Sequence, residues 1–98
     1  MRNYILEGKR PVACNDLLQW ATWLGSADRR VALNEYGDVC VSTVFLGIDY
    51  GWYKSRPMLF ETKVFGGKYD RKIGRYSTWR EAEIGHTKMC KKVFSSVL

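Results

Sequence analysis

Between positions 29 and 48 the apolar residues recur at about every second position, and this period of two is the strongest constraint on the fold. Residues 29–34 (RRVALN) and 39–48 (VCVSTVFLGI) alternate in this way on either side of the sequence EYGD. Gly37 lies in that sequence, and glycine adopts the backbone conformations of a tight turn without strain. The pattern therefore predicts two antiparallel strands joined as a hairpin.

Four further strands are predicted from shorter signals. The first fourteen residues predict a hairpin with Gly8 in its turn, and residues 75–78 (RYST) predict a short last strand or a lead-in to the helix that follows. Apolar and polar residues alternate clearly over residues 58–65 (MLFETKVF). Pro57, just before them, has no backbone N–H to donate to a neighbouring strand. One face of that strand carries Met58, Phe60, Thr62 and Val64, and the other face carries Glu61 and Lys63.

Two segments instead show the spacing of a helix face. The first follows an N-cap at Asn15 or Asp16 and stops at Gly25. Its predicted core-facing stripe is Leu17, Trp20, Ala21 and Leu24. The second follows Thr78, which forms a capping box with Glu81. Its predicted stripe is Trp79, Ala82, His86, Met89 and Val93.

The order of these elements predicts an α+β fold, with an antiparallel sheet of about four to six strands and two helices packed on one face. Ninety-eight residues make a single domain, residues 1–98, and 46% hydrophobic residues exclude a disordered chain. Three cysteines without CxxC spacing predict free thiols and a reducing compartment. The apolar run 39–48 is too short to cross a bilayer, so we expect a soluble intracellular protein without a membrane partner.

The charge is concentrated in the last third of the chain. Residues 1–61 carry seven basic and seven acidic residues, whereas residues 62–98 carry nine basic and three acidic residues and hence the whole net charge of +6. Within that third, basic residues alternate with tyrosines in the segment GGKYDRKIGRY, at Lys68, Tyr69, Arg71, Lys72 and Arg75. Such a mixture suits an anionic partner, a protein or a nucleic acid, and the alternative is a solvated loop.

A second candidate for partner binding is the aromatic pair Trp52 and Tyr53, which stands beside Lys54 and Arg56. Exposed aromatic and arginine residues are typical of interaction hot spots. The alternative is that the pair covers the end of the core.

Three polar residues lie in otherwise apolar segments: Asp49, Glu61 and His86. If they converge, two carboxylates and an imidazole can bind or hydrolyse a small, nucleotide-like ligand. Each also has a simpler interpretation. Asp49 suits a turn that precedes Gly51, Glu61 suits a surface ion pair, and His86 suits a hydrogen-bonded core position.

No catalytic, metal or cofactor site is predicted beyond that. The sequence has no phosphate-binding glycine loop, nucleophile elbow or zinc-protease motif. His86 and Cys90 are four residues apart, but the other cysteines have no metal-ligand spacing relative to them. We therefore expect no enzyme, no metal and no cofactor, and nothing in the sequence indicates an oligomeric state.

Three motifs occur together in order: DVCVSTVFLGIDYGW, PMLFETKVFGG and RYSTWREAEIGHTKM. In these the chain resembles a family of small, uncharacterised accessory proteins of tailed bacteriophages and prophages, over about residues 38–89. It departs from that family in the segments YGWYKSRP and GGKYDRKIG, where those proteins are acidic and rich in glycine.

The resemblance implies a phage protein that acts in the host cytoplasm. There, such proteins commonly bind a host factor and inhibit or redirect it, for example in counter-defence. This binding function is the main hypothesis from the sequence. The alternative is the small-ligand site of Asp49, Glu61 and His86.

Overall fold

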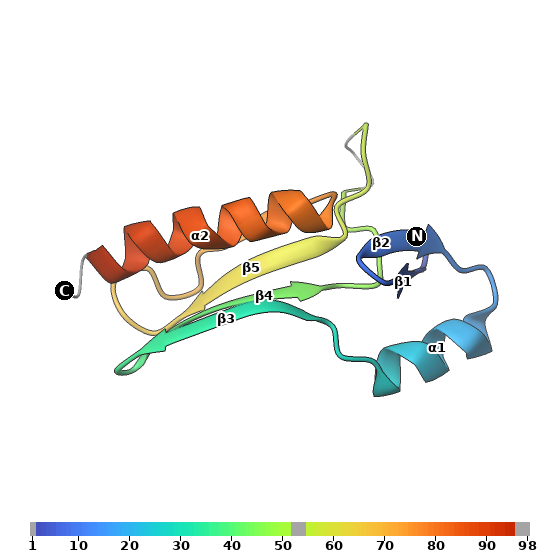
Figure 1. Cartoon of the computed structure of the whole chain (residues 1–98), viewed down its shortest axis with the longest axis horizontal. Coiled ribbons are helices and arrows are strands. Elements are labelled where there is room, and N and C mark those ends of the chain that lie inside the picture. The colour runs from blue at the N-terminus through green and yellow to red at the C-terminus, as the bar shows by residue number, and fades with distance from the viewer. Residues whose placement is uncertain (1, 52–54, 96–98) are drawn as a thin grey trace.

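The computed structural model describes residues 2–51 and 55–95. Along the chain its elements are β1 (Tyr4–Glu7), β2 (Arg10–Ala13), α1 (Leu17–Ser26), β3 (Arg30–Tyr36), β4 (Val39–Phe45), β5 (Phe60–Phe65), β6 (Ile73–Tyr76) and α2 (Trp79–Ser95). Figure 1 shows β3, β4 and β5 side by side beneath α2, with the β1–β2 hairpin and α1 toward one end. The predicted α+β fold is confirmed.

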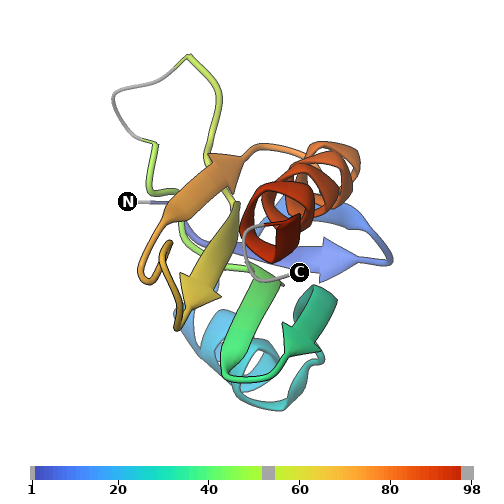
Figure 2. The ribbon, with the colours of Figure 1, turned by 90° about the vertical axis from the view of Figure 1, so that its left-hand side faces the viewer.

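The main sheet is a four-stranded antiparallel meander in the order β3-β4-β5-β6. Its register pairs Thr43 with Thr62 and Val44 with Glu61, so alternate residues of β4 and β5 face α2. The strands curve around that helix (Figure 2). Within β5 the predicted division is confirmed, because Phe60, Thr62 and Val64 are fully buried while Glu61 and Lys63 lie on the other face. It does not extend to Met58 and Leu59, which precede the strand, because Leu59 is buried and Met58 is half-buried.

Helix α2 covers this sheet on one side. The capping box forms as predicted, since the Glu81 amide donates to Thr78 Oγ1 at 3.1 Å and the Thr78 amide donates to Glu81 Oε1 at 3.1 Å. The predicted stripe is also confirmed, with Ala82, His86, Met89 and Val93 buried and Trp79 half-buried. Apolar contacts between this stripe and β4 and β5 form the core.

The hairpin β1–β2 forms where predicted but pairs separately from the main sheet. It is attached at the end of β4, where the Tyr4 amide donates to the Gly47 carbonyl at 2.9 Å and Asn3 pairs with Ile48. Tyr4 and Leu6 then pack against the core cluster around Phe45. The hairpin therefore closes one end of the core.

Helix α1 does not lie where the sequence predicted it. Its main contacts are with β1, it meets the core at one end, where Trp23 packs against Phe45, and none of its residues is fully buried. Asp16 caps it, as predicted, because its side chain accepts a hydrogen bond of 3.0 Å from the backbone N–H of Gln19. The stripe was partly wrong, because Leu17 and Ala21 are exposed.

The true inner face of α1 is set by tryptophan contacts. Trp20 Nε1 donates to the Gly47 carbonyl at 3.0 Å, and the Trp23 ring meets Phe45 edge-on at 5.7 Å. Gly47, with φ of +79°, leaves room for this docking, since a Cβ there would come within 2.7 Å of Leu24 Cδ1. These contacts turn Leu17 and Ala21 toward solvent.

A glycine in the middle of α2 also serves packing. A Cβ at Gly85 would lie 2.2 Å from Tyr76 Cζ, so the absent side chain lets the Tyr76 ring lie directly against the helix. Glycine in a helix interior costs about 1 kcal/mol relative to alanine. The contact between Tyr76 and α2 offsets that cost.

We predict that Gly85→Ala destabilises the protein although alanine is the better helix former, because the new Cβ displaces the Tyr76 ring. The matched test is Gly85→Ala in a Tyr76→Ala background, where the clash is absent and the substitution should stabilise by about 1 kcal/mol. Urea unfolding of the four proteins measures both effects. Equal effects of Gly85→Ala in the two backgrounds would contradict this role of Gly85.

Candidate functional site

His86 belongs to a buried chain of polar side chains rather than to an open site. Its Nδ1 lies 2.7 Å from Thr43 Oγ1 and its Nε2 lies 2.7 Å from Asn34 Oδ1, while Thr43 Oγ1 lies 2.5 Å from Thr62 Oγ1. A neutral ring satisfies this arrangement, with Nε2–H donating to Asn34 and Nδ1 accepting from Thr43. Burial lowers the pKa of His86 from its ordinary value, which favours the same neutral form. Both ring nitrogens are therefore occupied within the fold.

Glu61 lies on the opposite face of the sheet from His86. Its Oε2 accepts from Arg75 Nε at 3.0 Å, across the β5–β6 pair. The predicted surface ion pair is confirmed, with the cross-strand neighbour Arg75 as the partner. The Lys63 ammonium instead lies 5.4 Å from the Phe65 ring centroid. Arg75 also stacks over Tyr50 at 5.1 Å.

Asp49 makes the turn contacts predicted for it. Its Oδ1 accepts from the Gly51 amide at 2.7 Å and from the Met58 amide at 2.9 Å. One carboxylate oxygen thus joins both ends of the segment that links β4 to β5. Asp49 closes this loop at its base.

The three residues do not form one site. His86 is buried beneath α2, Glu61 pairs with Arg75 on the other side of the sheet, and Asp49 binds backbone amides. The hypothesis that they converge on a small ligand is therefore wrong in its geometry. Each has a contact within the fold instead.

The predicted partner-binding residues are only partly brought together. Lys68 and Lys92 both place their ammonium groups over the Tyr69 ring, at 5.5 and 5.4 Å. Arg71 has a left-handed backbone (φ 71°) and lies 3.8 Å from Asp70. Arg75 is paired on the open face of the sheet, and Trp52 and Tyr53 fall outside the described residues.

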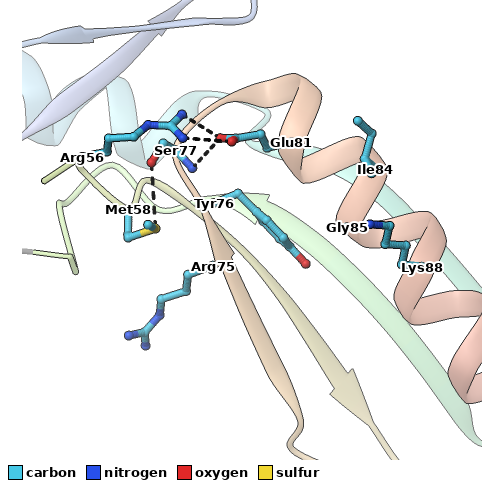
Figure 3. A pocket seen from close by; sticks show the side chains of 9 residues that line it. All are labelled: Arg56, Met58, Arg75, Tyr76, Ser77, Glu81, Ile84, Gly85 and Lys88. Atoms are coloured by element: carbon cyan, nitrogen blue, oxygen red, sulfur yellow. Dashed lines mark hydrogen bonds and ion pairs between the residues drawn. The ribbon is translucent and has the colours of Figure 1, made fainter. Parts of the chain in front are cut away.

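Lys72 lies in a groove between β6 and α2 that the sequence did not predict. The groove consists of two adjoining hollows of about 290 and 260 Å³, which share Tyr76, Gly85 and Lys88. Figure 3 shows the larger hollow, in which the Tyr76 side chain lies between the strand and the helix. The smaller hollow adds Lys72, Met89 and Lys92. We call the two hollows together the basic groove.

The charges around the basic groove are unequal. Among the described residues, five cations line it, and Glu81 is the one acidic lining residue. Arg56 holds Glu81 through two hydrogen bonds of 3.0 and 2.9 Å, and the hydrogen bond from Arg56 is the main reason why the pKa of Glu81 is lowered (Figure 3). Among residues 2–51 and 55–95, Lys72, Lys88 and Lys92 form no ion pair.

A signal for this groove was present in the sequence. Lys88 and Lys92 are four residues apart and so lie on one face of a helix, the same spacing that joins Gly85 to Met89. Without the fold, these lysines are explained equally well by the helix dipole, which favours cations near the last turn. The approach of Lys72, sixteen residues earlier, could not be read from that spacing.

Other kinds of site find no support in the part of the chain that is described. Its His, Cys, Asp and Glu side chains form no group of three that could hold a metal ion, and Cys14, Cys40 and Cys90 are free. None of its helices is long and apolar enough to span a bilayer. No protein-family model, curated protein or solved structure matches the chain.

We predict that His86 makes stability depend on pH. Because folding lowers the pKa of His86 from 6.5, the unfolded state takes up a proton at a higher pH than the folded state does. The free energy of unfolding should not be reduced by this effect above pH 6.5. It should fall as the pH drops below 6.5, by at most about 1.4 kcal/mol per pH unit. Urea unfolding between about pH 7 and about pH 5 measures this fall.

His86→Gln is the control for this effect. It should be less stable at neutral pH but should lack the fall, since glutamine does not titrate. Glu81 does not interfere, because its lowered pKa costs stability only below its ordinary value of 4.5. An identical pH profile in the wild type and the variant would show that another group is responsible.

We also predict that Asp49 is needed for loop closure rather than for its charge. Asp49→Asn keeps the accepting oxygen, whereas Asp49→Ala leaves the Gly51 and Met58 amides without this partner, at a cost of roughly 1–3 kcal/mol. Thermal unfolding of the two variants compares these costs. If Asp49→Asn loses as much stability as Asp49→Ala, the negative charge of Asp49 matters instead.

Proposed function

We propose that this is a non-catalytic binding protein, and that its basic groove takes an acidic segment of a protein partner. The observation that carries the proposal is the cluster of Lys72, Lys88 and Lys92 around the Tyr76 ring. All three lysines are exposed and none is needed for the core. Cations that the fold leaves unpaired are available to an anionic partner.

An acidic protein segment fits this groove better than a nucleic acid does. Single-stranded nucleic acids are held largely by stacking of bases on exposed aromatic rings. The two tyrosines nearby are already engaged, Tyr76 by the helix at Gly85 and Tyr69 by Lys68 and Lys92. Lysines along a groove without a free ring favour carboxylates over bases.

The resemblance to phage accessory proteins supports a partner from the host. In this proposal the protein acts in the host cytoplasm, where it binds a host protein and thereby inhibits or redirects it. The side chains that the sequence offered for acid–base chemistry instead hold the fold together, which favours binding over catalysis. The chemistry of the groove defines the partner only as an acidic surface or segment.

We predict that Lys72, Lys88 and Lys92 changed together to Gln weaken partner binding by roughly threefold to a hundredfold, since exposed charge pairs contribute roughly 0.2–1 kcal/mol each. The variant should fold normally. The tagged wild-type protein is used to capture proteins from a bacterial lysate, and the purified partner is then titrated against both proteins. Affinity should fall as salt is added, because salt screens exposed charges.

The matched control is Arg71, Arg80 and Lys91 changed together to Gln. It removes the same charge from residues that do not line the basic groove, so binding should be retained. Equal losses in the two variants would mean that net charge, and not the groove, attracts the partner. Tighter binding to a single-stranded oligonucleotide than to a polyglutamate peptide would point to nucleic acid instead.

A further inference from the structure

Helix α1 leaves two large apolar side chains exposed to solvent in the isolated chain. Leu17 is 67% exposed and Leu18 is 77% exposed, although they are neighbours on the first turn. Between Leu17 and Ser26 the helix has no charged residue. A helix that meets water on one face normally carries charged or polar side chains there.

A hollow lies beside these leucines. It measures about 440 Å³ and lies between α1 and β1, lined by Ile5, Asp16, Leu18, Gln19, Thr22 and Trp23. A projecting apolar group and an apolar hollow therefore lie within about one turn of the same helix. A surface that carries both can pair with itself about a two-fold axis, with each copy filling the hollow of the other.

Charge favours a second copy at this place. The net charge of +6 comes from residues 62–98, and residues 1–61 sum to zero. Two copies of a basic chain repel each other least where their surfaces are neutral. An anionic membrane surface is disfavoured as the occupant, because α1 itself offers no cation to the lipid headgroups.

The end of the molecule formed by α1 and the hairpin is large enough for a stable contact. A standard interface buries about 800 Å² on each partner. That is about one eighth of the 6343 Å² of accessible surface, and residues 4–26 make up nearly a quarter of the chain. A ten-residue helix also gains most of its stability from packing against other elements. A second copy would supply such packing on the exposed side of α1.

We propose that the protein forms a two-fold dimer through the apolar outer face of α1, with Leu17 and Leu18 at its centre and the hairpin β1–β2 at its edge. This inference is independent of the proposed function. The dimer leaves both basic grooves open, because α2 and β6 take no part in the contact.

Sedimentation velocity and light scattering of the purified full chain test the proposal over a wide range of concentrations. The wild type should reach twice the mass of the chain, and Leu17→Asp and Leu18→Asp should each remain monomeric. Both leucines are too exposed to be needed for folding, which circular dichroism checks. Amide exchange in α1, but not in α2, should slow as the dimer forms.

Ile84→Asp is the matched control, because Ile84 is 46% exposed on α2, away from the proposed contact. It should dimerise like the wild type. A wild type that stays monomeric throughout, a dimer that persists in both leucine variants, or an equal loss in Ile84→Asp would overturn the proposal. So would a monomer that binds lipid vesicles through α1.

Discussion

A polar layer in the middle of the core determines how the rest of the molecule is arranged. Thr43 of β4, Thr62 of β5 and His86 of α2 meet between two apolar clusters, one around Val41, the other around Phe45. Buried polar groups must find partners, and leaving one unpaired costs roughly 1–3 kcal/mol. A shift of α2 by one turn would break the hydrogen bonds of His86 while placing other apolar groups in contact. The layer therefore fixes the register of the helix on the sheet.

The basic groove depends on this register. Gly85 precedes His86, so the position that places the imidazole beside Thr43 also places the glycine against Tyr76. Lys88 and Lys92 follow on the side of the helix that borders β6. The basic groove is thus a consequence of the same contacts that hold the core, and its lysines add nothing to those contacts.

Much of the fold could be predicted from the sequence because its strongest signals are local. The alternation of residues along the chain identified the buried and exposed faces of β4 and β5. The capping box and the apolar stripe after it identified the start and the buried face of α2. The interpretations of Asp49 as a turn residue and Glu61 as a surface partner succeeded for the same reason. Each depends on residues close in sequence or directly opposite in a strand pair.

The errors arose where position depends on distant contacts. Helix α1 has apolar residues on nearly every side, so its spacing could not identify which side would be buried. Contacts of Trp20 with Gly47 and of Trp23 with Phe45 decide it, over more than twenty residues of chain. The basic groove was missed for a related reason, because Lys72 and Lys88 meet only once β6 lies beside α2.

The two proposed surfaces divide the chain according to charge. The neutral first part of the sequence exposes leucines that the core does not use, and the basic last part exposes lysines that no acidic residue in the described structure pairs with. Two copies joined through α1 would present two basic grooves in one assembly. Two linked sites bind a partner with paired or repeated acidic segments more tightly than one site does, because the second contact forms at a high effective concentration. The weak contribution of each exposed lysine would then suffice for stable binding.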